Sequence, residues 1–255
     1  DLGLKPSFCT FEENEFETIC RQDHQRMTCF LDMRYVAGGQ KIYDSLSHYF
    51  RQDICKKEQS IFIAHKLQER DERHKKMGNS RYFLEPNIKE NKGGLRDLQT
   101  LHWITNYLYD EDSIHILKQK NILNQEEAES FYHASDFLWV VRCHLHLLSN
   151  KAEEVLRFDS QLDIAERMGY RGKNRQDAAE KFMKDYFHTA RKAGYLTRIF
   201  CAILEEKSLT AGLTETKSHI TDQNNIDDFH GYSLKNGRIH LSIEFNFKNE
   251  ISEII

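Results

Sequence analysis

The feature that most constrains the fold of this chain is a pair of long apolar stripes in its second half. Apolar residues recur every three or four positions from Phe131 to Leu148, and again from Ala179 to Ile203. That spacing places them along one face of an α-helix. The 255 residues contain two prolines and 12 glycines, so long segments carry no helix breaker. These patterns predict a mainly α protein built as an antiparallel helical bundle.

Start and stop signals predict further helices along the chain. Asn124 and Glu127 form a capping box at the start of the first stripe. Asp97 is placed to cap the helix that carries Leu98 and Leu108. The remaining predicted helices begin near Phe11, run through Leu31, Met33 and Val36, cover Ile42 to Tyr49, run from about Lys57 to Met77 with a stop at Gly78-Asn79, and begin near Asn174.

The C-terminal part has a different pattern. Residues from Gly212 to Asn225 are polar and aperiodic, which is typical of a linker. Apolar and polar residues then alternate from Ile239 to Phe247, which predicts a strand. Asn236-Gly237 precedes it and favours a tight turn, since both residues tolerate positive φ. A short β-hairpin is therefore expected near the C-terminus.

Composition excludes several classes of protein. The formal net charge is −4, so no global field draws the chain onto nucleic acid or membranes. Nine Lys and Arg residues lie between Lys66 and Arg96, but five acids are interleaved with them, which favours a solvated helix face. No apolar run approaches membrane-spanning length. The six cysteines form no CxxC pair and indicate reduced thiols in a cytoplasmic protein.

The segment from Asn87 to Asp97 carries the strongest chemical signal. It combines three cations with a Gly-Gly pair, and glycine lets a backbone approach an anion closely. A phosphate or nucleotide site is one interpretation, and a solvated charged loop in which the glycines turn the chain is the other. The candidate nucleotide-binding residues are Asn87, Lys89, Lys92, Gly93, Gly94, Arg96 and Asp97.

This segment, read on to Ile104, resembles the bacterial PII uridylyltransferase/uridylyl-removing enzymes. That family attaches UMP to the PII nitrogen-signalling protein and removes it. The chain keeps the family pattern Asn-x-Lys-Glu-Gly-x-Gly-Gly-Leu-Arg-Asp except for one glycine, which is replaced by Asn91. Other stretches similar to family motifs follow in the family's order: Leu31–Arg34, Phe137–Leu148, Phe158–Gln161, Met168–Tyr170 and Phe182–Tyr186.

The resemblance implies a domain map and identifies the chain as an internal fragment of a longer enzyme. Residues 1–52 would be the C-terminal remnant of an α/β nucleotidyltransferase domain. Residues 53–208 would be the helical domain of the family, and residues 209–255 a linker and β-hairpin leading to a hydrolase domain. The first residue is Asp1 and the last is Ile255, and both ends are expected to be cut.

The resemblance also implies the activity of the parent enzyme. It would transfer UMP from UTP to a tyrosine of PII and remove it hydrolytically when glutamine is high. Lys89, Lys92 and Arg96 would neutralise the triphosphate, while Asn87 and Asp97 hold the loop by hydrogen bonds. Mg²⁺ would be bound by residues outside this chain. Nucleic acid and membranes are not expected as partners.

Catalytic metal ligands are not expected within the chain. Asp110-Glu111-Asp112 has the spacing of a metal-binding acidic pair, but it follows a predicted helix and Asp112 is better placed as a cap. His144 and His146 project about 200° apart on a helix and cannot share a metal. No His-Asp dipeptide occurs. The rival reading is therefore a non-catalytic helical binding or adaptor module, or the helical domain of another nucleotidyltransferase.

Overall fold

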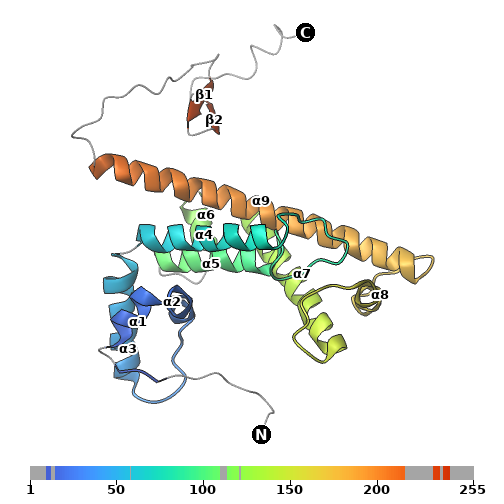
Figure 1. Ribbon diagram of the computed structural model, residues 1–255, viewed down its shortest axis with the longest axis horizontal. Coiled ribbons are helices and arrows are strands. Elements are labelled where there is room, and N and C mark those ends of the chain that lie inside the picture. The colour runs from blue at the N-terminus through green and yellow to red at the C-terminus, as the bar shows by residue number, and fades with distance from the viewer. Residues whose placement is uncertain are drawn as a thin grey trace. The chain divides into compact units, whose positions relative to one another are not determined.

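The computed structural model describes residues 10–12, 15–57, 59–109, 114–120, 122–215, 232–235 and 238–241 (Figure 1). The chain divides into two compact units, residues 1–209 and 210–255. The described part of the chain is mainly helical, as predicted. Its helices are α1 (Phe16–Gln22), α2 (His24–Leu31), α3 (Gln40–Tyr49), the π-helical turn η2 (Phe50–Cys55), α4 (Gln59–Lys76), α5 (Leu95–Tyr109), α6 (His115–Gln119), α7 (Gln125–Ser149), α8 (Phe158–Arg167) and α9 (Arg175–Glu215).

The N-terminal helices are shorter than predicted. Helix α2 ends at Leu31, so the prediction of one helix through Met33 and Val36 is wrong. Val36 is 80% exposed, and Gly38 with φ of 109° turns the chain before α3 begins. An apolar residue without a buried partner gives a helix nothing to pack against. The predicted helix from Ile42 to Tyr49 is confirmed as α3.

The assignment of residues 1–52 to the end of an α/β domain stays a prediction. The described residues in this stretch are helical or irregular, and residues 1–9 lie outside the described part. Their core is aromatic: the ring centroids of Phe16 and Phe30 lie 4.7 Å apart, and those of Phe16 and Phe50 lie 6.0 Å apart. This cluster ties α1 and α2 to η2.

Helices α4 and α5 form the pair on which the candidate site is built. Figure 1 shows them side by side, running in opposite directions, with α7 crossing them obliquely. The ring of Phe62 stacks on that of Tyr107 at 4.0 Å, with 9° between the planes, and both side chains are buried. Helix α4 ends before Gly78 (φ 78°) and Asn79 (φ 55°), as predicted.

Helix α5 begins three residues earlier than predicted. It starts at Leu95, so Asp97 lies in its first turn and the prediction that Asp97 precedes the helix as its cap is wrong. The carboxylate is fully buried and accepts a hydrogen bond from the Gly93 amide at 2.7 Å. Asp97 therefore still satisfies an amide ahead of the helix, but from inside the first turn.

The two apolar stripes form the core of the first unit, as predicted. At α7, the Asn124 side chain accepts from the Glu127 amide at 2.9 Å, and the Glu127 carboxylate accepts from the Asn124 amide at 2.8 Å. This confirms the capping box. Buried stripe residues are Phe131, Ala134, Leu138, Val141 and Leu145 on α7, and Ala179, Phe182, Tyr186, Ala190, Ala193, Leu196 and Phe200 on α9.

Helix α9 is longer than its stripe. It runs to Glu215, so the linker predicted from Gly212 to Asn225 is helical in its first four residues, and residues 216–225 lie outside the described part. In the second unit, β1 (Tyr232–Lys235) pairs antiparallel with β2 (Arg238–Leu241), with Leu234 opposite Ile239. Residues 236–237, predicted as the turn, and 242–255 are not among the described residues.

Candidate functional site

The Asn87–Asp97 loop is held by its own polar groups. The Asn87 side chain accepts hydrogen bonds from the amides of Lys89 at 3.1 Å and Glu90 at 2.8 Å. The Asn91 side chain in turn accepts from the Asn87 amide at 2.7 Å. Asn91, the one departure from the family pattern, therefore closes the loop through its side chain, a contact that glycine does not offer.

The same loop is anchored to a distant segment of the chain. The Ile88 amide donates to the carbonyl of Glu154 at 2.9 Å, and the Leu156 amide donates to the carbonyl of Pro86 at 2.9 Å. Asn87 and Val155 form an isolated antiparallel bridge between these bonds. The connection between α7 and α8 thus fixes the position of the loop.

The Gly-Gly pair packs against the protein itself. Gly93 has a φ of 81°, and a Cβ added there would lie 2.1 Å from the Ala190 carbonyl oxygen of α9. The Gly93 amide donates to Asp97, and the Gly94 amide donates to the Asn91 carbonyl at 2.8 Å. Because these amides already donate within the protein, the loop can offer only side chains to a ligand. The glycines instead allow the loop backbone to lie close to α9.

Asp97 ties the loop to α4. Its carboxylate receives hydrogen bonds from Arg73 and, at 2.8 Å, from Nε2 of His74. Burial alone would raise the pKa of Asp97, but the His74 hydrogen bond, the charges of His74 and Arg73, and the Gly93 amide hold that pKa below its ordinary value. The carboxylate is therefore ionised and held by several donors, and its role is to join the loop to α4.

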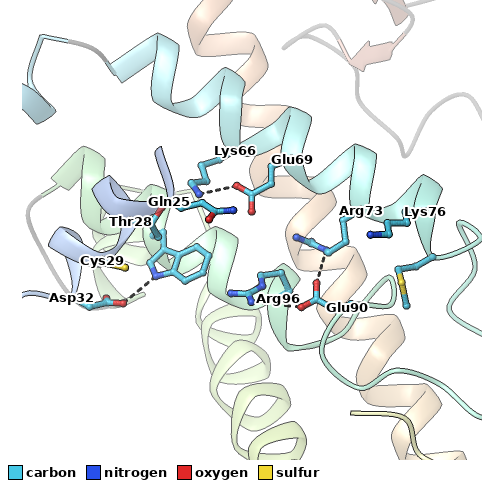
Figure 2. A pocket seen from close by; sticks show the side chains of 12 residues that line it. Gln25, Thr28, Cys29, Asp32, Lys66, Glu69, Arg73, Lys76, Glu90 and Arg96 are labelled. Carbon is cyan, nitrogen blue, oxygen red and sulfur yellow. Dashed lines mark hydrogen bonds and ion pairs between the residues drawn. The ribbon is translucent and has the colours of Figure 1, made fainter. Parts of the chain in front are cut away.

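A pocket of about 570 Å³ lies beside this clamp, between α2, α4 and α5 (Figure 2). A pocket of this size can hold a small organic ligand. Its lining contains four basic residues and three acidic ones. The full set is Gln25, Thr28, Cys29, Asp32, Lys66, Glu69, Arg73, Lys76, Met77, Glu90, Arg96 and Trp103.

Glu90 lies among the arginines of this pocket. Figure 2 shows Arg73 and Arg96 both extending toward Glu90. Their nitrogens are 3.8 Å and 3.6 Å from its carboxylate oxygens, beyond hydrogen-bonding distance. Guanidinium groups bind planar oxyanions through two parallel hydrogen bonds. Arg73 also pairs with Asp97, and Arg96 also donates to Gln99 at 3.0 Å, so both guanidinium groups are fixed in position. Their contact with Glu90 is the loose one, and a phosphate group could replace it.

Trp103 forms the aromatic wall of the pocket. The Lys66 ammonium and the Arg96 guanidinium each lie 5.4 Å from the centroid of its ring, within the range of a cation–π contact. Lys66 is 3% exposed and pairs with Glu69 at 2.8 Å, so its charge is compensated inside the protein. The pocket therefore joins positive charge to an indole surface.

The structure separates the three predicted cations of the loop. Arg96 lines the pocket. Lys89 lies 3.8 Å from Glu90 and 4.0 Å from Glu154, and Lys92 donates to Asn79 at 3.4 Å. Of the predicted set, Asn87, Gly93, Gly94 and Asp97 shape the loop through the contacts described above.

The basic residues of α4 were missed as site residues because their segment was interpreted as a solvated face. Three of them, Lys66, Arg73 and Lys76, lie with Glu69 at a spacing of three, four and three, which puts all four on one side of the helix. That periodicity was a usable signal. The periodicity does not reveal that α5 packs beside this face of α4 and makes it a wall of the pocket.

The described residues contain no group of three or more His, Cys, Asp or Glu side chains arranged to hold a metal ion. The Asp110-Glu111-Asp112 stretch lies outside the described part. None of the five described cysteines, Cys20, Cys29, Cys55, Cys143 and Cys201, forms a disulfide, and Cys9 is not described. None of the described helices combines the length and apolarity needed to cross a membrane.

The fold and pocket define an α-helical domain with a pocket between its helices that is lined by four basic and three acidic residues. A protein-family model described as GlnD PII-uridylyltransferase matches residues 61–201, from α4 to α9, including the whole Asn87–Asp97 loop and the α4 and α5 walls of the pocket. The chain belongs to this family, as its motifs predicted. No solved structure matches the chain.

Proposed function

We propose that this chain is part of an enzyme that transfers UMP from UTP to a tyrosine of PII and removes it hydrolytically, and that these residues position the nucleotide and PII. The observation that carries the proposal is the place of Arg96. It belongs to the motif that identifies the family, and it faces a pocket with Arg73, Lys76 and Lys66 of α4.

In this proposal the pocket receives the phosphates of UTP. Transfer makes a bond between the tyrosine oxygen and the α-phosphorus and breaks the bond to pyrophosphate, which leaves with additional negative charge. Arg96, Arg73 and Lys76 stabilise that charge electrostatically. Binding displaces the weak interaction of the arginines with Glu90, whose oxygens lie 3.6 Å and 3.8 Å from them. Lys89 and Lys92 add positive charge at the loop, as the family resemblance implies.

Asn87, Gly93, Gly94 and Asp97 contribute by fixing the loop. Their hydrogen bonds and the close contact of Gly93 with α9 determine where the backbone of Arg96 lies. Preorganisation of this kind lowers the entropic cost of binding. A substitution at these positions should therefore weaken nucleotide binding without removing a direct contact.

Magnesium would be bound by residues outside this chain. The pocket carboxylates do not fit a metal ion, since Glu69 pairs with Lys66, Glu90 faces two arginines, and Asp32 accepts from the Trp103 indole at 3.3 Å. Glutamine, the proposed effector, would likewise bind elsewhere in the whole protein. We place the protein in the cytoplasm because its six cysteines form no CxxC pair, a pattern of reduced thiols.

The experiment compares Arg96→Ala with Arg198→Ala in the whole protein that carries this chain. Arg198 is an exposed arginine of α9 outside the pocket. Uridylylation of PII is followed with UTP labelled at the α-phosphate, and UTP affinity by calorimetry. We expect Arg96→Ala to weaken UTP binding by about tenfold or more and Arg198→Ala to leave it unchanged.

The rival function, a non-catalytic helical adaptor, predicts a different result. Unmodified protein would bind PII without incorporating label from UTP. If label is incorporated but both arginine variants behave alike, the enzyme assignment stands and the pocket is not its nucleotide site.

A further inference from the structure

A second pocket adjoins the cationic one. Its volume is about 430 Å³, and it lies between α5 and α7, at the end of α2. Asp32 and Trp103 line both pockets. Asp32 is held there by the Trp103 indole at 3.3 Å and faces His102 at 3.9 Å. The two pockets therefore meet at a tryptophan and a carboxylate that is fixed in place.

The chemistry of the second pocket differs from that of the first. Both tryptophans of the chain, Trp103 and Trp139, line it, together with the rings of His102 and Tyr132. Asp32 is its one formally charged lining residue. Trp139 is 41% exposed although Arg142 lies over its ring at 5.0 Å, so the indole keeps surface on which a flat ligand can pack. An uncharged ring suits this pocket and a polyanion does not.

Gln99 links the two pockets. Its side-chain oxygen accepts a hydrogen bond from the Arg96 guanidinium at 3.0 Å, and its side chain lines the aromatic pocket. This bond fixes the amide orientation, and Nε2 makes no hydrogen bond to the described residues. The amide thus presents a donor to the aromatic pocket. A donor matches the 4-carbonyl oxygen of uracil, whereas the 4-amino group of cytosine would oppose it.

We propose that the aromatic pocket between α5 and α7 binds the uracil base of UTP while the adjoining cationic pocket binds its phosphates. This inference rests on the proposed function and adds a base-binding site to it. A nucleoside triphosphate needs a stacking surface joined to a cluster of cations, and Trp103 lies at that junction. Stacking on aromatic rings provides affinity, and the Gln99 donor provides the preference for uracil.

The test fills the aromatic pocket and leaves the cationic pocket intact. Ser135 lines the aromatic pocket from α7, and Ser130, on the same helix and also half-buried, lines a different one. The variants Ser135→Phe and Ser130→Phe are therefore a matched pair. Their affinities for UTP and for inorganic tripolyphosphate are measured by calorimetry in the whole protein, after circular dichroism has verified folding.

We expect Ser135→Phe to weaken UTP binding about tenfold or more and to leave tripolyphosphate binding unchanged, because only the base is displaced. Ser130→Phe should change neither affinity. Equal UTP affinity in the two variants would overturn the inference while leaving the proposed function intact. If unmodified protein bound neither UTP nor tripolyphosphate, the proposed function would fail and the inference with it.

Gln99→Leu provides a second test that does not depend on the tolerance of α7 for phenylalanine. Loss of the donor should reduce the ratio of UTP affinity to CTP affinity. Both nucleotides carry the same triphosphate, so a shift of Arg96, which Gln99 also holds, affects the two affinities alike. An unchanged ratio would overturn the role of Gln99 in selecting uracil.

Discussion

The carboxylate of Asp97 lies 2.8 Å from Nε2 of His74, and Asp97 is completely buried while His74 is 8% exposed. This contact joins the first turn of α5 to the last turn of α4. The Gly93 amide and the Arg73 guanidinium complete the set of donors around the carboxylate. The position of the candidate phosphate site therefore depends on one buried charge with several partners.

Removal of that charge should destabilise the protein strongly. Asp97→Asn keeps the shape of the side chain but leaves Arg73 without its buried counter-charge, at an expected cost of about 3–5 kcal/mol in the free energy of unfolding. Asp163→Asn is the control, because Asp163 also pairs with an arginine, Arg175, but both are exposed. Its cost should be about 0–1 kcal/mol. Urea unfolding measures both, and equal losses would contradict the clamp.

The lowered pKa of Asp97 leads us to expect a particular change of stability in acid. The pKa of Asp97 in the folded protein is lowered, since the donors of His74, Arg73 and Gly93 outweigh the effect of burial, which opposes ionisation. Its contribution to stability is therefore complete above the ordinary aspartate pKa of about 3.9 and is lost as the pH falls through the lower folded value. Urea unfolding at several pH values should show a steeper loss in acid for the unmodified protein than for Asp97→Asn. If the free energies of unfolding of the two proteins fell equally with pH, Asp97 would not be the source of the acid sensitivity.

Gly93 should be far less tolerant of substitution than a glycine of the same backbone conformation. Gly93 and Gly169 have φ values of 81° and 83°, but a Cβ at Gly169 would meet no atom within 4 Å. Alanine should cost about 1–2 kcal/mol of backbone strain at both sites. At Gly93 the clash with the Ala190 carbonyl should add about 1–3 kcal/mol. Thermal or urea unfolding of the two variants measures this difference. Equal losses in the free energy of unfolding would show that α9 moves to make room for the side chain.

Adjacent lysines at the end of α4 offer a matched test of the pocket. Lys75 and Lys76 are both exposed, but only Lys76 lines the cationic pocket. Lys76→Ala should weaken binding of UTP by about three- to fivefold at low salt, and Lys75→Ala should not. The difference should shrink at about 0.5 M salt because exposed charges are screened. A similar loss in both variants would indicate a general field effect and no phosphate contact at Lys76.

Local signals predicted the helices well where they were confined to one segment. The capping box at Asn124 and Glu127, the stop at Gly78-Asn79 and the apolar stripes of α7 and α9 depend on residues a few positions apart, and all of them are present. The motif around Gly93-Gly94 identified the family correctly. Its glycines suggested a cradle for an anion, and in the structure they accommodate α9.

The helical class, the register of the long helices and the family could be predicted from the residues alone, because helix periodicity and capping are short-range effects. The roles of the charged residues depend instead on how the helices pack. Arg96 faces α4 cations that precede it by 20 to 30 positions, and Asp97 is buried by helices folding over it. Trp103 of α5 and Trp139 of α7 line the same pocket. Burial and long-range electrostatics depend on which faces pack together, and no local pattern contains that information.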